Sequence, residues 1–168
     1  MDVNQAGAMT AGILVMPLIA GPVGGIIGDR ISRKNPRNKV MLCYLSAIAA
    51  LVMFALAILF NMWPFFFAVT FFVFFFIPVQ QIIGQEVVPF YQRATAYGVY
   101  VFCMYFLGGL WGPAVTGMIS DASNLQVAFW INAGILLVAS FGYLIMYKFY
   151  SADYRKARQL EAGTQVST

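Results

Sequence analysis

Two adjoining stretches near the start of the chain decide its fold: residues 8–28, AMTAGILVMPLIAGPVGGIIG, and residues 29–39, DRISRKNPRNK. The first stretch carries no charge and has the length, about 20 residues, that a helix needs to cross a hydrocarbon core of about 30 Å. The second holds one acidic and five basic residues. This order is typical of a transmembrane helix that ends at a cytoplasmic surface.

Four more apolar runs follow, at residues 40–62, 65–85, 94–119 and 127–149. Of the whole chain, 61% is hydrophobic and 10% is charged, whereas about a quarter of a soluble domain is charged. Lipid offers no partners to backbone groups, and the runs are too long for barrel strands. The sequence therefore predicts an all-α fold: a polytopic membrane helix bundle with five transmembrane helices in residues 1–150, followed by a cytoplasmic polar tail in residues 151–168. An ordinary soluble enzyme, a disordered tail and a disulfide scaffold are excluded, and we expect Cys43 and Cys103 to be small buried hydrophobes.

The basic residues predict the orientation of this bundle. All ten Lys and Arg lie in residues 29–39, in residues 86–93 or from residue 148 onward, which are segments on one side of the predicted membrane. The positive-inside rule places that side, with the C-terminus, in the cytoplasm. The N-terminus is then outside, in an inner or plasma membrane. Because an odd number of spans with an outside N-terminus and no signal-peptide pattern is unusual, we expect a piece of a longer polytopic protein.

Glycines and charges alternate in a specific way where the first span ends. Gly21, Gly25 and Gly28 fall at i, i+4 and i+7, which predicts one smooth helix face for a neighbouring backbone. Gly25, then Asp29-Arg30, then Arg33-Lys34 resembles a loop motif of the major facilitator superfamily, with Ser32 in place of a second glycine. The alternative is that the basic residues serve only to stop translocation of the chain across the membrane.

Two further patterns resemble the same superfamily. Glu86 and Arg93 are similar to an acid and an arginine that flank a later cytoplasmic loop, and the resemblance implies that they pair with Asp29 in a network that holds the cytoplasmic gate shut. Arg30, Arg33 and Lys34 would lie at its edge. The glycine-rich stretch after residue 107 resembles the eleventh helix, which the resemblance implies can flex as well as pack, although packing alone would explain most of these positions: Gly108, Gly109, Gly112, Pro113 and Gly117.

The third span lacks the arginine motif usual in the fourth helix of the superfamily, so the five spans resemble helices eight to twelve, the C-terminal half. The residues after the loop motif are similar to the spinster-like group, carriers of lysolipids, sphingolipid phosphates and other organic solutes. The implied fold is thus a partial major facilitator fold. Its expected partners are the lipid bilayer, a small-molecule substrate, and the missing N-terminal helices or another chain.

Substrate contacts must come from uncharged side chains, because no Asp, Glu, Lys or Arg lies at mid-span. Tyr105 is the best single candidate, and hydrogen bonding between helices is the alternative role for the amides. The full set of candidates is Gln80, Gln81, Tyr105, Trp111 and Asn132.

The function that these features predict is secondary transport of a small organic or lipid-like solute. The alternatives are a small non-transporting membrane scaffold and a half-molecule that works only with a partner chain. Since the chain has no His and no nucleophile–base pair or metal-ligand cluster, we expect no enzyme activity, cofactor or metal site, and no nucleic-acid partner.

Overall fold

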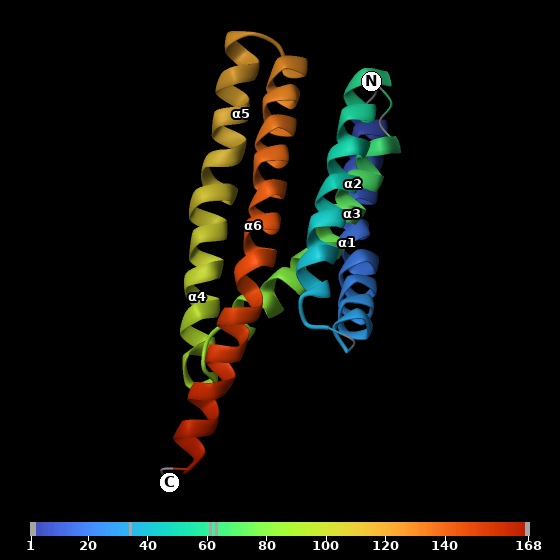
Figure 1. Cartoon of the computed structure of the whole chain (residues 1–168). Coiled ribbons are helices and arrows are strands. Elements are labelled where there is room, and N and C mark those ends of the chain that lie inside the picture. Colours follow the sequence, from blue (N-terminus) through green and yellow to red (C-terminus); the bar gives the residue numbers. More distant parts are fainter. Residues whose placement is uncertain (1–2, 34, 61, 63, 167–168) are drawn as a thin grey trace.

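Long helices make up almost the whole described chain. The computed structural model describes the protein apart from residues 1–2, 34, 61, 63 and 167–168, and leaves further side chains undescribed near both ends. The helices run side by side along one common direction (Figure 1). Their bounds are α1 (Val3–Ser32), α2 (Asn38–Phe60), α3 (Pro64–Glu86), the 3-10 turn η1 (Phe90–Gln92), α4 (Arg93–Cys103), the π-helix η2 (Met104–Leu110), α5 (Trp111–Ala122) and α6 (Leu125–Val166).

The predicted membrane helix bundle is confirmed. Among the described residues, five segments are long and apolar enough to cross a membrane. They are Thr10–Ser32, Asn38–Phe60, Pro64–Glu86, Phe90–Ala122 and Leu125–Gly163. The fourth segment is one helix interrupted by a π-helical stretch, and the fifth continues far beyond the predicted end at residue 149.

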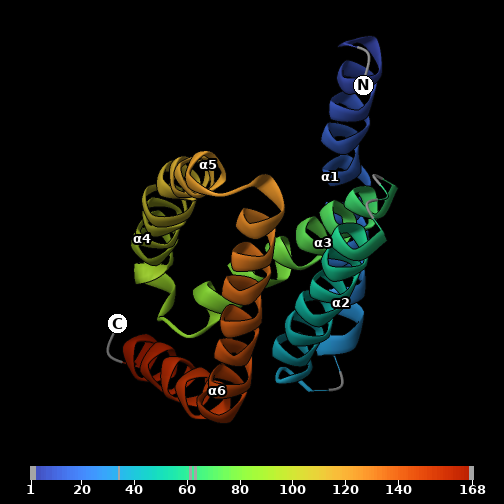
Figure 2. The ribbon, with the colours of Figure 1, turned by 90° about the horizontal axis from the view of Figure 1, so that it is seen from above.

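The core lies where α2, α3 and α6 meet. Helix α3 packs along both α1 and α2, while α6 packs against α2 on one side and α5 on the other. Seen from above, α6 therefore stands between the α1–α3 group and the α4–α5 pair (Figure 2). The buried cluster holds these seven residues: Val40, Cys43, Ala47, Phe76, Val79, Ile83 and Tyr150. Cys43 is buried as expected, whereas Cys103 is exposed on α4, because no other helix covers that face.

The helices α1 and α3 approach each other so closely that only glycine fits between them. A Cβ atom at Gly24 would lie 1.9 Å from the carbonyl oxygen of Phe75, and one at Gly28 would lie 2.7 Å from Val79 Cγ2. At Gly21 and Gly25, by contrast, nothing in the described structure lies within 4 Å. Of the three glycines on the predicted face, Gly28 contacts α3 in this structure, and Gly21 and Gly25 contact no other helix among the described residues. Positions 21, 25 and 28 lie on one side of the helix, and positions 24 and 28 also lie one turn apart. Helix α3 packs against Gly24 and Gly28.

Substitution of Gly24 tests this close approach. We expect Gly24→Ala to lower the free energy of unfolding by about 1–3 kcal/mol, because a backbone carbonyl cannot move aside as a flexible side chain can. The matched control is Gly25→Ala, which adds the same methyl group to open space and should be neutral or slightly stabilising through helix propensity. Thermal unfolding of the purified protein in detergent measures both, and equal stability of the two variants would contradict the packing.

Candidate functional site

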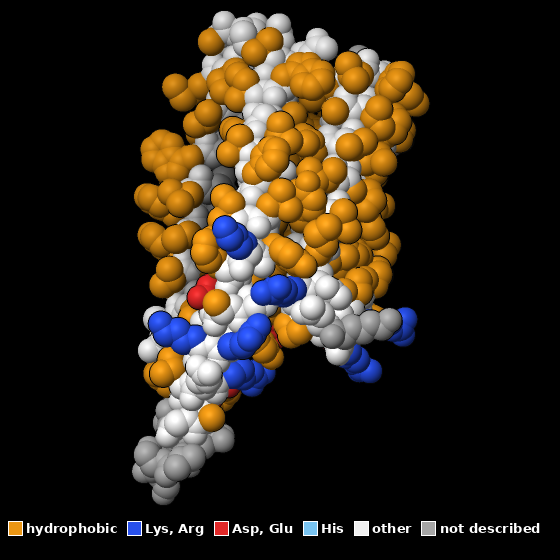
Figure 3. Space-filling view, viewed as in Figure 1, with side chains coloured by type: hydrophobic (Ala, Val, Ile, Leu, Met, Phe, Trp, Pro, Cys, Tyr) orange, Lys and Arg blue, Asp and Glu red, His pale blue; other side chains and the backbone are white. Residues whose placement is uncertain are grey.

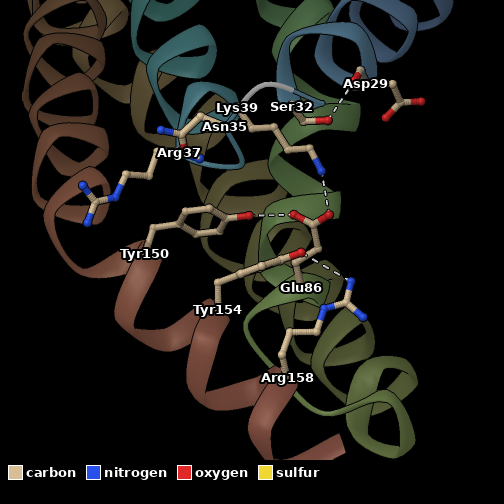
Figure 4. A network of polar contacts seen from close by, with 9 residues as sticks. All are labelled: Asp29, Ser32, Asn35, Arg37, Lys39, Glu86, Tyr150, Tyr154 and Arg158. Atoms are coloured by element: carbon tan, nitrogen blue, oxygen red, sulfur yellow. Dashed lines mark hydrogen bonds and ion pairs between the residues drawn. The ribbon is translucent and has the colours of Figure 1, made fainter. Parts of the chain in front are cut away.

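A partly buried ion pair joins three helices at one end of the bundle. The carboxylate of Glu86, the last residue of α3, accepts hydrogen bonds from Lys39 Nζ of α2 at 2.6 Å and from the Tyr150 hydroxyl of α6 at 2.6 Å (Figure 4). The side chain of Lys39 is only 7% exposed and that of Glu86 22%. Charges held this far from water interact strongly, but they are costly to leave without a partner.

A second charge cluster connects α4 to the last part of α6. Arg93 begins α4, and its Nη2 lies 2.6 Å from Glu161 Oε1. Arg158 donates to the other carboxylate oxygen of Glu161 at 3.2 Å and to the Tyr154 hydroxyl at 3.4 Å. The Arg93 guanidinium also lies over the ring of Phe90, 5.5 Å from its centroid. The segment that leads from α3 into α4 is thus held by α6.

Arg37 forms a third contact between α6 and the loop that follows α1. Its Nε donates a hydrogen bond to Ser151 Oγ, and its guanidinium lies 5.9 Å from the centroid of the Tyr147 ring. The backbone N–H of Arg37 donates to Asn35 Oδ1 at 3.1 Å, which shapes the turn before α2. Together the three contacts tie this end of α6 to α2, α3 and α4.

The end of α1 does not take part in these contacts. Asp29, Arg30 and Arg33 are exposed, and their side chains have no ion-pair partner among the described residues. The Asp29 carboxylate lies apart from Glu86 (Figure 4), and the Asp29 backbone carbonyl accepts hydrogen bonds from the Ser32 hydroxyl at 2.8 Å and from the Arg33 N–H at 3.3 Å. The predicted network of Asp29, Glu86 and Arg93 is therefore not assembled within this bundle, since the last two have other partners. Lys34, the remaining predicted member, lies outside the described residues.

The sequence analysis missed the partners that the structure supplies: Lys39, Tyr150, Tyr154, Arg158 and Glu161. A usable signal exists in the tail, where Tyr150, Tyr154, Ala157 and Glu161 follow the i, i+4, i+7, i+11 spacing of one helix face. Lys39 gives no such signal, because it looks like any other basic residue of a cytoplasmic loop.

The glycine-rich helix departs from α-helical geometry in its middle. Residues Met104–Leu110 are π-helical, and Pro113 follows within one turn. Proline has no N–H to donate to the carbonyl four residues earlier, that of Gly109, so the α-helical ladder is interrupted here. No Cβ at Gly108, Gly112 or Gly117 would meet anything within 4 Å in the described structure. Inside this bundle, these glycines do not serve close packing.

The substrate-contact candidates do not converge on one point. The Tyr143 hydroxyl donates to Gln80 Oε1 at 2.9 Å, and Asn132 Nδ2 donates to Thr116 Oγ1 at 3.0 Å. These two amides therefore hydrogen-bond between helices, as the alternative role required. Tyr105 and Trp111 are 65% and 54% exposed, and Gln81 is half-buried.

One cavity, of about 280 Å³, lies between α3, α4 and α6. Its lining includes Gln80, Tyr100, Tyr150 and Asp153, together with apolar side chains such as Met146. Of the predicted substrate contacts, only Gln80 lines this cavity. Within the described residues, no three potential metal ligands gather into a group.

Five helices long and apolar enough to cross a membrane, three of which share a buried core, define this chain as an integral membrane protein of the helix-bundle class. The family profile described as Major Facilitator Superfamily matches residues 1–167, and the chain belongs to that superfamily. No curated protein and no solved structure matches the chain significantly. Members of this superfamily are transporters, so the match supports secondary transport as the general class of function.

Neutralising Glu86 tests the three-helix contact. Glu86→Gln leaves the ammonium of Lys39 buried without a counter-charge, so we expect a loss of about 3–5 kcal/mol in the free energy of unfolding. Asp121→Asn is the control, because Asp121 is an exposed acid without a described ion pair at the other end of the bundle. Thermal unfolding in detergent compares the two, and a Glu86→Gln protein as stable as the control would refute the proposed energetics.

Proposed function

We propose that this chain is the C-terminal membrane half of a secondary transporter, equivalent to helices eight to twelve of the superfamily fold. The observation that carries the proposal is the unpartnered motif at the end of α1. Gly25 faces open space, and Asp29, Arg30 and Arg33 have no ion-pair partner among the described residues. A glycine face and a carboxylate left free by their own bundle suit contact with a second set of helices.

The gate in this proposal divides its charges between two tasks. Glu86 and Arg93 hold the cytoplasmic ends of α2, α3, α4 and α6 together, through Lys39, Tyr150 and Glu161. Asp29 and its basic neighbours face the other half, whether that half comes from the same polypeptide or from a partner chain. Alternating access requires two halves that rock about a central site, and these rim contacts would form and break during that motion.

The charge distribution supports a cytoplasmic C-terminus. Lys and Arg side chains gather at one end of the molecule, and apolar side chains cover the remainder of the visible face (Figure 3). That end contains the loop after α1, the α3–α4 connection and the last part of α6. By the positive-inside rule it faces the cytoplasm of an inner or plasma membrane, and the N-terminus of α1 lies on the outer side.

The solute that this half would help to carry is small and organic or lipid-like, as in the spinster-like carriers. The side chains that we propose for solute contact are uncharged, and two of them are aromatic. Tyr105 lies within the π-helix and Trp111 directly follows it, so movement of η2 would reorient both rings. Gln80 and Gln81 of α3 and Asn132 of α6 would supply polar contacts. π-helical segments within α-helices are frequent at functional sites, which supports this placement.

The size of the native protein tests the half-molecule assignment. An antibody raised against the tail should detect, in native membranes, a band well above the 18.6 kDa of this chain. The expected mass is roughly double or more, because the fold then includes the missing helices. A band at 18.6 kDa would favour either a half-molecule with a separate partner or a non-transporting scaffold.

Neutralising Asp29 distinguishes a transporter from a scaffold. In cells that express the native protein, we expect Asp29→Asn to reduce uptake of a fluorescent lysophospholipid by about tenfold, the effect of losing one charge-assisted contact. Membrane insertion and thermal stability should stay at wild-type values, since the carboxylate has no described partner in its own bundle. Asp121→Asn serves as the control. Normal uptake by Asp29→Asn would contradict the gating role.

A further inference from the structure

Helix α6 is about twice as long as the membrane is thick. Its 42 residues, at 1.5 Å per residue, extend over about 63 Å, whereas the hydrocarbon core measures about 30 Å. Its last part leans sideways under the start of α4, as the two views of the ribbon agree (Figures 1 and 2). A polar helical segment has no reason to lie under α4 unless contacts with neighbouring segments hold it there.

The two faces of this extension differ in chemistry. One face carries Tyr150, Tyr154, Ala157 and Glu161, of which Tyr150 and Ala157 are 1% and 3% exposed. The residues on the opposite face are exposed and basic, and none has an acidic partner among the described side chains: Lys148, Arg155 and Lys156. The extension thus turns its one paired acid, Glu161, toward the bundle. There, Glu161 Oε1 lies 2.6 Å from Arg93 Nη2.

The segment held by this acid has little else to hold it. No residue of α4, η2 or α5 is buried in the described structure, and no side chain caps the first turn of α4. The α3–α4 connection runs alongside the extension, with Val88 and Pro89 on one side of a shared cleft and Ala157 and Leu160 on the other. Arg93, the first residue of α4, is where the ionic contact is made.

We infer that residues 150–163 of α6 form a clamp that fixes the first turn of α4, with Glu161 as the positioning residue that holds Arg93. Arg158 completes the clamp, since it binds the second oxygen of Glu161 and the Tyr154 hydroxyl. The clamp rests on the proposed function in one respect: η2 is proposed to move during transport, and α4 leads directly into η2. Release of Glu161 would free α4 at its cytoplasmic end, while the Lys39–Glu86–Tyr150 contact keeps α2, α3 and α6 together.

Amide hydrogen exchange of the full chain in lipid nanodiscs tests the clamp without any substrate. In Glu161→Gln we expect backbone amides in residues 93–98 and in residues 154–163 to exchange about tenfold faster than in the wild type. Arg93→Gln should have the same effect, and Arg93→Lys, which keeps the charge, should retain most of the protection. The matched control is Asp153→Asn, which makes the same kind of change on the same helix at an acid without a described ion pair.

Two results would overturn the clamp. If residues 93–98 exchange equally fast in Glu161→Gln and Asp153→Asn, the extension does not hold α4. If Arg93→Lys loses as much protection as Arg93→Gln, the contact does not depend on the ion pair. Because the readout needs no solute, a chain that fails to transport could still contain the clamp, and a transporter could lack it.

Discussion

The constraint on which the rest of this structure depends is the absence of hydrogen-bond partners in lipid. Every backbone N–H and C=O group in the hydrocarbon core must be satisfied within the protein, so an apolar chain of this length becomes a set of helices. The same constraint makes the π-helical segment Met104–Leu110 a candidate for a functional role, because it departs from α-helical geometry. A π-helical segment beside Pro113 is tolerated in lipid only where neighbouring groups, or a water-filled cavity, satisfy the carbonyls it frees.

Much of the fold was predictable because transmembrane spans are set by length and charge, which are local properties of the sequence. The predicted ends were less accurate where helix formation continues beyond the lipid. Helix α6 extends to Val166 because residues 152–162 are mostly good helix formers, such as Ala, Arg, Lys and Leu. Hydropathy indicates where the membrane ends, and it does not indicate where the helix ends.

The candidate site was predictable in its members but not in its pairings. The resemblance singled out Glu86 and Arg93, and both do form ion pairs at the same end of the bundle, with Lys39 and Glu161. The partner of Glu86 lies 47 residues away and depends on how α2 packs against α3, and the partner of Arg93 lies 68 residues away and depends on how α6 leans under α4. The tail pattern indicates which face of α6 is buried, but the helix that this face meets is decided by tertiary packing. The face of α1 that packs within this bundle has a similar origin, since it is decided by where α3 lies.

The burial of Lys39 separates two explanations for the basic loop after α1. If its basic residues only oriented the chain in the membrane, each of them could stay in water, as Arg30 and Arg33 do. Removing an ammonium from water costs several kcal/mol, and only a well-placed counter-charge offsets that cost. Lys39 is 7% exposed and Glu86 lies 2.6 Å away, with Tyr150 satisfying the second carboxylate oxygen. Orienting the chain in the membrane requires neither the burial nor the pairing of Lys39. The pair therefore serves to join helices. Water that enters between α3 and α6 would weaken it. An ion pair that weakens when water reaches it can hold helices together while the site is dry and release them once it is wet.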